Sequence, residues 1–360
     1  MNKRVMIAMS GGVDSSVAAY LLTRQNYNCI GVTMKLFNND NVFVSKEKAC
    51  CSLEDVEDAR SVAFRLKIPY YVFNFKDDFD EKVIKSFINA YENGLTPNPC
   101  IDCNRYIKFE KLFWRAKQLD FDYIATGHYV RIEKDVATSR YLLKKAVDET
   151  KDQSYVLYSM TQDQLAHTLF PLGGMKKTEV RQIAQEQGLR NADKQESQDI
   201  CFVVDGDYKK FIENYTNKVY PPGDFIDENG NILGEHKGLI SYTTGQRKGL
   251  GIAHEKPLYV KSKDIQKNTV TLSEEKGLYS TTFYVNNLNW IAFDNLTQPI
   301  KVKAKVRYRQ VEQPATIYPY DEEAVKVIFD EPQRAITSGQ AAVFYDGEVV
   351  VGGGTISNVL

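Results

Sequence analysis

The chain has 360 residues, which is enough for two or three domains that each bury an apolar core. Hydrophobic residues make up 43% and charged residues 26%, as is typical of a soluble globular protein. The formal net charge of −1 excludes a generally basic nucleic-acid-binding chain, so any RNA site has to be a local patch. No apolar window is long enough to span a membrane and the N-terminus lacks the apolar region of a signal peptide, so we expect a cytoplasmic protein.

A phosphate-binding loop is predicted near the N-terminus. The apolar run Val5–Met9 predicts a buried strand, SGGVDSS follows at residues 10–16, and apolar residues then recur at helical spacing from Val17. Glycines let the backbone approach an anion, and the free N–H groups and dipole of a helix start attract it. The hydroxyls of Ser15 and Ser16 can add hydrogen bonds. The loop matches neither a Walker A loop nor GxGxxG, and a plain glycine turn with a helix cap is the alternative.

The first 130 residues alternate between predicted strands and helices. Further strands are expected at residues 29–34, 69–75 and 123–127. This alternation predicts a parallel sheet with helices on both faces, in which ligands bind beyond the carboxyl ends of the strands. Ser10, Met34 and Gly127 lie at such ends, which indicates one shared nucleotide site.

The rest of the chain changes character. Residues 129–147 predict a hairpin, Pro221-Pro222-Gly223 marks a change in composition, and short alternating strands continue to the end. We therefore predict an α/β protein with three parts. They are a Rossmann-like parallel-sheet domain at residues 1–207, a small central α+β domain at residues 208–280, and a C-terminal antiparallel β-barrel at residues 281–360.

Cysteines supply the second chemical signal. Cys100 and Cys103 lie in NPCIDCN, and Cys201 lies in ESQDICF. Cys103 opens a predicted helix, whose positive end favours a thiolate, and two thiols can hand sulfur between them. C-x-x-C also fits a redox pair, half a zinc site, or part of an iron–sulfur site with Cys201 as third ligand. The other three cysteines, at positions 29, 50 and 51, are interpreted as structural.

A basic stripe is predicted in the C-terminal region. Lysine or arginine occupies every odd position from Lys301 to Arg309, and apolar residues fill most even ones. On a strand this spacing places all five cations on one face. The stripe predicts contacts with RNA phosphates, and the alternative is a solvated outer face of a barrel strand.

Taken in order, the motifs resemble one family. SGGVDSS resembles the pyrophosphate-binding loop of ATP pyrophosphatases. Together with NPCIDCNRYIKF, ATGHY, KDQSYVLY, ESQDICF, GEHKGLISYTTGQRKGLGI and SGQAAVFYDGEVVVGGGTI, it resembles the tRNA-specific 2-thiouridylases over nearly the whole chain. The resemblance implies ATP-dependent thiolation of carbon 2 of the wobble uridine of tRNA, with adenylation of the oxygen, sulfur transfer from a cysteine persulfide, and release of AMP and pyrophosphate.

Two other classes remain open at this stage. One is another ATP pyrophosphatase that forms an amide or C–N bond through an adenylate. The other is a thiol protein without ATP, either a disulfide oxidoreductase or a metal-bound RNA-binding module.

The resemblance also implies roles for single residues. It makes Cys103 the nucleophile and Cys201 the persulfide carrier, with a transient disulfide between them. The residues implied to bind ATP are Ala8, Met9, Ser10, Gly11, Gly12, Val13, Asp14, Ser15, Met34 and Gly127. Those implied to meet the target base are Asn98, Pro99 and Cys100. Those implied to contact tRNA are His128, Lys151, Asp152, Gln153, Arg307, Tyr308 and Gln340.

Partners and cofactors follow from the same resemblance. We expect ATP as co-substrate, Mg²⁺ with Asp14 as a plausible contact, and a cysteine desulfurase or relay protein as the persulfide donor. An iron–sulfur cluster at Cys100, Cys103 and Cys201 stays open. One position departs from the family pattern, because Cys100 stands where some members have an aspartate. An acid–base role for that carboxylate is therefore in doubt, unless Asp102 or a water replaces it.

Overall fold

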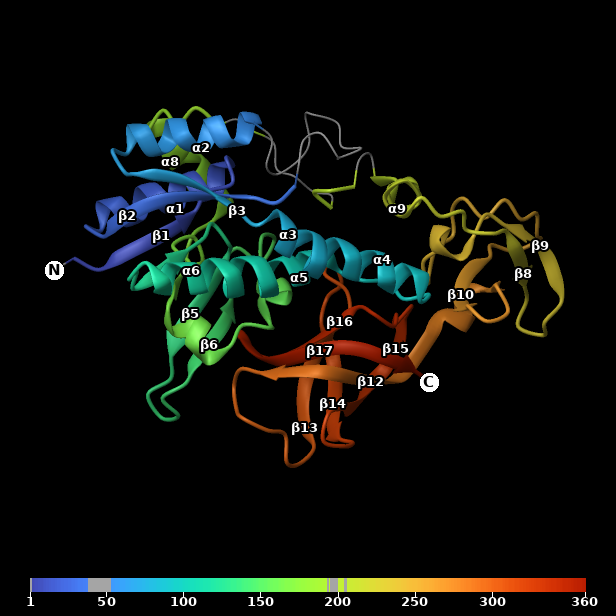
Figure 1. The fold of residues 1–360 in the computed structure, drawn as a ribbon. Coiled ribbons are helices and arrows are strands. Elements are labelled where there is room, and N and C mark those ends of the chain that lie inside the picture. Colours follow the sequence, from blue (N-terminus) through green and yellow to red (C-terminus); the bar gives the residue numbers. More distant parts are fainter. Residues whose placement is uncertain (1, 38–52, 193, 195–199, 204–205) are drawn as a thin grey trace.

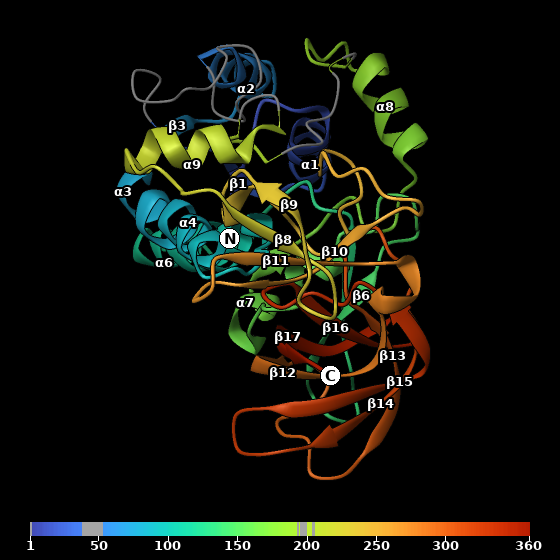
Figure 2. The same ribbon diagram turned by 90° about the vertical axis from the view of Figure 1, so that its right-hand side faces the viewer.

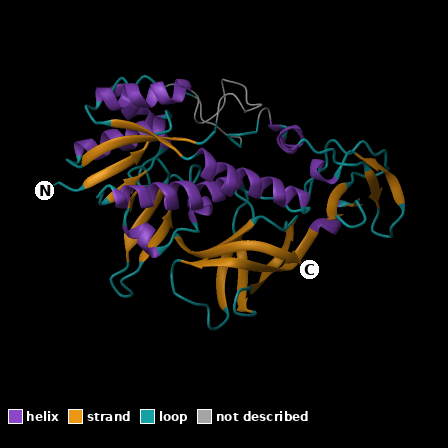
Figure 3. Cartoon of the chain, viewed as in Figure 1, coloured by secondary structure: helices purple, strands orange, loops and turns teal. Residues whose placement is uncertain are grey.

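The computed structural model describes residues 2–37, 53–192, 194, 200–203 and 206–360, and it contains three sheets (Figures 1 and 3). The predicted fold class is confirmed: a parallel α/β sheet is followed by a small central sheet and a closed antiparallel barrel. None of the helices in the described ranges is both long and apolar enough to cross a membrane.

The N-terminal sheet has five parallel strands in the order β3-β2-β1-β4-β7. The strands are β1 (Arg4–Ala8), β2 (Asn28–Lys35), β3 (Tyr70–Asn74), β4 (Tyr123–Ala125) and β7 (Thr168–Leu169). Strand β7 was not predicted, because two residues are too few to show a periodic pattern. Since all five strands run the same way, the loops after β1, β2 and β4 gather at one edge of the sheet.

Helices cover both faces of this sheet, as predicted (Figure 1). On one face α1 (Val13–Arg24), α2 (Leu53–Arg65) and α8 (Lys177–Glu186) contribute to a core that includes Val5 and Ile7. The other face buries Met6 and Ala8 against a helical run made of α5 (Pro99–Asp102), the π-helical segment η2 (Cys103–Leu112) and α6 (Phe113–Gln118). The alternation of inward side chains along β1 thus serves two separate cores.

A second helical run lies beside the first. It consists of α3 (Lys76–Phe79), the π-helical turn η1 (Asp80–Ile84) and α4 (Lys85–Glu92), and it ends at Gly94, whose φ lies in the left-handed region. Shorter helices complete this part of the chain: η3 (Ser154–Leu157) and α7 (Gln162–Ala166).

The central part begins with a helix that was not predicted, α9 (Tyr208–Thr216). Its four-stranded sheet has the order β10-β11-β8-β9 and contains β8 (Gly223–Ile226), β9 (Ile232–His236), β10 (Tyr259–Asp264) and β11 (Thr269–Ser273). Two short helical turns flank these strands, η5 (Leu239–Ser241) and η6 (Glu275–Leu278). A turn at Asn229-Gly230 joins β8 to β9 in an antiparallel hairpin.

The C-terminal barrel is closed by pairing of its first and last strands. Its strands are β12 (Tyr279–Trp290), β13 (Ile300–Lys305), β14 (Gln313–Pro319), β15 (Val325–Arg334), β16 (Ala341–Asp346) and β17 (Val349–Val359). The barrel and the central sheet form separate groups of strands (Figure 2).

One feature of the eight-stranded sheet that contains the barrel was not predicted. The hairpin formed by β5 (Val130–Lys134) and β6 (Tyr141–Lys145) belongs in sequence to the N-terminal part, yet β6 pairs with β17 at Lys144 and Val349. The hairpin therefore continues the barrel sheet into the N-terminal α/β part. This pairing joins residues about 200 positions apart, so no local pattern announces it.

Candidate active site

The predicted phosphate loop connects β1 to α1. Gly12 ends the loop in an extended conformation, and its carbonyl accepts hydrogen bonds from the Ser15 hydroxyl at 3.1 Å and the Ser16 hydroxyl at 2.9 Å. Ser16 is fully buried. Its hydroxyl therefore holds the loop's shape, which corrects the expectation that both hydroxyls face a phosphate.

Gly11 is held from two sides. Its φ is +75°, and a Cβ at this position would lie 2.4 Å from the carbonyl oxygen of Asp55 on α2. Its own carbonyl accepts a hydrogen bond of 2.8 Å from the buried Nδ2 of Asn191, which also donates to the Ser16 hydroxyl. The sharp turn of the loop is thus fixed by packing that only glycine permits.

The other predicted nucleotide residues lie at the same edge of the sheet. A Cβ on Gly127, which follows β4, would lie 2.7 Å from the backbone nitrogen of Ser15, so the two loops are in direct contact. Met34, near the end of β2, packs against two of the apolar cores. The predicted convergence of Ser10, Met34 and Gly127 is thus consistent with the parallel register of β1, β2 and β4.

A lysine that was not predicted reaches the loop. The buried Lys177, at the start of α8, places its Nζ 2.7 and 2.8 Å from the two carboxylate oxygens of Asp14, and the Tyr129 hydroxyl donates to the same carboxylate at 2.7 Å. The loop has no Walker lysine, so Lys177 brings the cation that such a loop lacks. It lies 163 positions from Asp14, and a single lysine carries no local signal of this role.

The carboxylate of Asp14 contacts the ammonium of Lys177 and the hydroxyl of Tyr129, and its contact with Mg²⁺ stays a prediction. Within the described ranges, no three His, Cys, Asp or Glu side chains are grouped to hold a metal ion. Cys100, Cys103 and Cys201 are among the side chains to which this applies. No step below depends on Mg²⁺ or on an iron–sulfur cluster.

The helix that carries Cys103 begins earlier than predicted. Asn98 caps it by accepting a hydrogen bond of 3.2 Å from the N–H of Cys100, and Pro99 occupies the first turn. Cys103 lies four residues further along, where α5 passes into η2, and the effect of the positive helix end fades within the first turn. The positive end of the helix therefore favours a thiolate at Cys100, which is exposed, rather than at Cys103.

A carboxyl group precedes Cys103. Burial raises the pKa of Asp102 to about 6, opposed by the charge of the Arg105 guanidinium. Arg105 in turn donates to the Tyr158 hydroxyl at 3.5 Å. Asp102 is thus a half-buried carboxyl next to the predicted nucleophile.

Cys103 and Cys201 pack against one apolar cluster. Its buried core includes Phe79, Phe87 and Phe202, whose rings meet at 5.3 to 5.8 Å between centroids, and Met34 packs against it as well. Two cysteines 98 positions apart and a predicted nucleotide residue therefore share one environment. Cys29 lies in a different core, where burial raises its thiol pKa to about 11. Cys50, Cys51 and residues 196–199 of ESQDICF lie outside the described residues.

The barrel braces the segment that leads to Asn98. The side-chain amide of Gln340 donates to the carbonyls of Thr96 at 2.8 Å and Pro97 at 3.2 Å. The N–H of Thr96 donates to the carbonyl of Ser338 at 3.1 Å. Gln340 was predicted to contact tRNA. In the structure its side chain contacts the backbone directly before Asn98, which was predicted to meet the target base.

Two other predicted tRNA-contact segments meet each other. The Tyr308 hydroxyl, on an exposed side chain, lies 3.4 Å from the carbonyl of Asp152, and the ammonium of Lys305 lies 5.7 Å from the Tyr308 ring. Neighbouring Gln153 accepts a hydrogen bond of 2.9 Å from the N–H of Tyr129. Lys151, Asp152 and Gln153 thus share a surface region with Tyr308, although they are separated by about 155 positions.

The predicted basic stripe is only partly right. Lys301 and Lys303 project from β13 as expected, but the strand ends at Lys305, and Arg307 and Arg309 lie in a turn. Arg307 points inward and donates to the carbonyls of Thr244 and Ala335, both at 3.0 Å, and to the Thr337 hydroxyl at 2.6 Å. It therefore ties the central part to the barrel, which corrects its placement on an outer basic face.

His128 lies in the interior, with 8% of its surface exposed. Its ring nitrogens face the Thr126 hydroxyl at 2.7 Å and the ammonium of Lys108 at 3.5 Å. Burial lowers its pKa well below the usual value, so the imidazole is neutral. The contact of this ring with tRNA stays a prediction.

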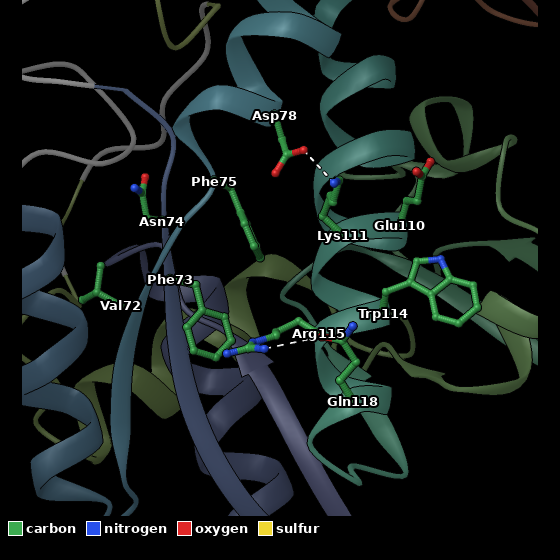
Figure 4. Close-up of a pocket in the computed structure, with 10 residues that line it drawn as sticks. All are labelled: Val72, Phe73, Asn74, Phe75, Asp78, Glu110, Lys111, Trp114, Arg115 and Gln118. Carbon is green, nitrogen blue, oxygen red and sulfur yellow. Dashed lines mark hydrogen bonds and ion pairs between the residues drawn. The ribbon is translucent and has the colours of Figure 1, made fainter.

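A surface pocket of about 570 Å³ lies between β3 and the helical run η2–α6 (Figure 4). Its lining includes Phe73, Trp114 and Arg115, and Lys111 pairs there with Asp78 at 2.7 Å. None of the predicted site residues lines it. The pocket is therefore separate from the predicted site residues.

Comparison with known proteins yields three family matches in chain order. Residues 3–205 match a family described as the tRNA methyl transferase HUP domain. Residues 209–274 match the tRNA methyl transferase PRC-barrel domain, and residues 280–356 match the aminomethyltransferase beta-barrel domain.

Curated relatives match over the full length. A protein of Clostridioides difficile named tRNA-specific 2-thiouridylase MnmA is 52% identical, covering 100% of this chain and 99% of that one. A protein of the same name from Clostridium acetobutylicum is 54% identical, covering 99% and 100%. Among solved structures, a 4-thiouridine synthetase with RNA and bound ATP has a TM-score of 0.35 and 16% identity, covering 59% of this chain and 50% of that one, and it carries no argument here.

Proposed function

Because the chain belongs to the tRNA-specific 2-thiouridylase family, we propose that it uses ATP to replace the oxygen at carbon 2 of the wobble uridine of tRNA with sulfur. It is then a tRNA-uridine 2-sulfurtransferase. An amide-forming synthetase and a thiol protein without ATP are set aside, since full-length relatives carry the thiouridylase name.

The first step activates the uridine. The carbonyl oxygen at carbon 2 forms a bond to the α-phosphorus of ATP, the bond from that phosphorus to the bridging oxygen breaks, and pyrophosphate leaves with the electron pair. The N–H groups of residues 10–15 and the ammonium of Lys177 would hold the triphosphate. The adenylated oxygen is a good leaving group, which a uracil carbonyl oxygen is not.

The second step transfers sulfur. The outer sulfur of a Cys201 persulfide attacks carbon 2, and AMP leaves with the electron pair of the C–O bond. The Cys103 thiolate then attacks the inner sulfur, so the S–S bond breaks and its electron pair stays on the outer sulfur, now the thiocarbonyl. A Cys103–Cys201 disulfide remains, and an external dithiol would reduce it. A cysteine desulfurase or relay protein would reload Cys201, and free sulfide released by Cys103 is the alternative route.

One observation carries this proposal: Cys103, Cys201 and Met34 pack against the same apolar cluster at the carboxyl edge of the parallel sheet. The chemistry needs both thiols near the nucleotide. Gln340 supports it, because that residue holds the segment before Asn98 and Cys103 in place.

The test is mass spectrometry of tRNA after incubation with ATP and a persulfide donor. Cys103→Ser and Cys201→Ser should each abolish 2-thiouridine, while pyrophosphate release in the presence of tRNA persists, because the serines remove the sulfur step only. Cys29→Ala is the matched control and should thiolate normally, since this cysteine lies in a separate core. Normal 2-thiouridine from either serine variant contradicts the proposed roles.

A further inference from the structure

Lys108 presents a charge that needs an anion. It is part-buried, and in the described part of the chain no carboxylate lies within ion-pair distance of its ammonium; its hydrogen-bond partner is Nε2 of His128 at 3.5 Å. An ammonium removed from water without a counter-charge is costly. This placement therefore indicates a negative ligand.

His128 cannot supply a negative charge, but it can orient the ammonium of Lys108. An ammonium only donates, so Nε2 of His128 accepts, and the ring proton sits on Nδ1, which donates to the Thr126 hydroxyl at 2.7 Å. The rings of Phe109 and Phe170 pack at 5.9 and 6.1 Å from the imidazole. The contacts with Thr126, Phe109 and Phe170 thus fix the orientation of the imidazole, and the ammonium of Lys108 favours the tautomer with the proton on Nδ1.

The location of Lys108 identifies the anion. In the π-helical register of η2, residues five apart are one turn apart, so Lys108 lies one turn from Cys103. On its other side, His128 follows Gly127, which packs directly against the backbone of Asp14 and Ser15. Lys108 therefore belongs to the cysteine helix and contacts, through His128, the loop that packs against the phosphate loop. The α-phosphate has to lie between the phosphate loop and this helix if it is to reach a base held near Asn98.

We infer that Lys108, held by His128, binds an oxygen of the α-phosphate of ATP and of the adenylated intermediate. The inference rests on the proposed function for the reaction but makes a claim about nucleotide binding alone. When AMP is transferred to the uridine oxygen, negative charge builds on the α-phosphate oxygens, and an ammonium at this point stabilises it. No covalent bond to Lys108 forms.

The experiment compares AMP, adenosine, MgATP and tRNA as separate probes in isothermal titration calorimetry with the full chain. Lys108→Met should weaken AMP and MgATP about tenfold to 100-fold, the range of one charge-assisted hydrogen bond, and leave adenosine unchanged. Lys111→Met is the matched control on the same helix, since Lys111 pairs with Asp78 in the outer pocket, and it should bind all four probes normally. His128→Gln should show a smaller loss with AMP than Lys108→Met.

Three results overturn the inference: unchanged AMP affinity in Lys108→Met, an equal loss with adenosine, or a loss with tRNA alone. If Lys108→Met does not fold, Lys108→Gln provides the same comparison. Failure of the proposed function is seen separately, as absence of 2-thiouridine from the unmodified chain, and it leaves the nucleotide titrations interpretable.

Discussion

Neighbouring residues in the phosphate loop carry different constraints. Gly11 has a positive φ and lies against the backbone of Asp55, whereas Gly12 has an extended backbone, and the nearest atom to a Cβ there is the Ser10 hydroxyl at 3.5 Å. Both are glycines in one motif. The tertiary contact with α2 makes the first of them irreplaceable.

We predict that Gly11→Ala lowers the free energy of unfolding by about 2 kcal/mol or more, because the methyl group overlaps Asp55 and the φ is unfavourable. Gly12→Ala should change it by less than about 1 kcal/mol, since its Cβ makes an ordinary contact. Chemical denaturation followed by circular dichroism measures both. Equal losses in the two variants contradict this account of the loop.

At the scale of elements, the central sheet is fastened to the helical layer through one strand. Lys263 on β10 donates to the carbonyl of Tyr242 at 2.9 Å and lies 5.8 Å from the ring of Tyr91 on α4. Burial lowers the pKa of Lys263 to about 8. The stability of the α4–β10 interface therefore depends on pH in the alkaline range.

The direction of this pH dependence follows from the lowered pKa of Lys263. Between pH 8 and 10.5 the folded chain has lost the Lys263 proton and the unfolded chain keeps it, so the contribution of this group to stability rises with pH, by at most about 1.4 kcal/mol per pH unit. Relative to Lys263→Met, the unmodified chain should therefore gain stability from pH 7.5 to 9.5 in denaturant titrations. Lys261→Met, on the same strand and paired with Glu228, should show no such trend. If the difference in free energy of unfolding between the unmodified chain and Lys263→Met does not change with pH, the lowered pKa of Lys263 is wrong.

At the scale of the whole molecule, the barrel holds the catalytic part and the central part together. Gln340 fastens it to the segment before Asn98, Arg307 fastens it to Thr244, and β17 pairs with β6 of the inserted hairpin. These contacts join residues that are 63 to 244 positions apart. The barrel thus positions the site, besides any surface it offers to RNA.

Two basic residues of the barrel should therefore behave differently. Arg307→Met should lower the free energy of unfolding by about 2 to 3 kcal/mol, because carbonyls of Thr244 and Ala335 lose their donor. Lys303→Met, on the exposed face of β13, should leave stability unchanged and reduce the salt dependence of tRNA binding by about one phosphate contact. Calorimetry and filter binding at several salt concentrations measure these effects. A stable Arg307→Met, or an unchanged salt slope in Lys303→Met, contradicts the assignment.

Local patterns were sufficient for most of the elements and for the order of the three parts, but not for β7, α9 or the pairing of β6 with β17. Strand, glycine turn and helix start predicted the loop after β1, and the alternation of strands and helices predicted the parallel sheet, because periodicity and turn chemistry act over a few residues. The motif order also led to the family, which full-length relatives confirm.

Contacts between distant residues had no such signal. Lys177 at Asp14, Asn191 at Gly11, Lys108 at His128 and the inward turn of Arg307 arise only when separate elements pack. A lone lysine, asparagine or arginine has the same local pattern whether it is solvated or buried, and burial with a partner is a property of the assembled chain. The sequence therefore determined the fold class and the family, because these follow from local periodicity and motif order. The packed structure decided which charges pair at the phosphate loop and which hold the parts together, because these contacts join residues far apart in the chain.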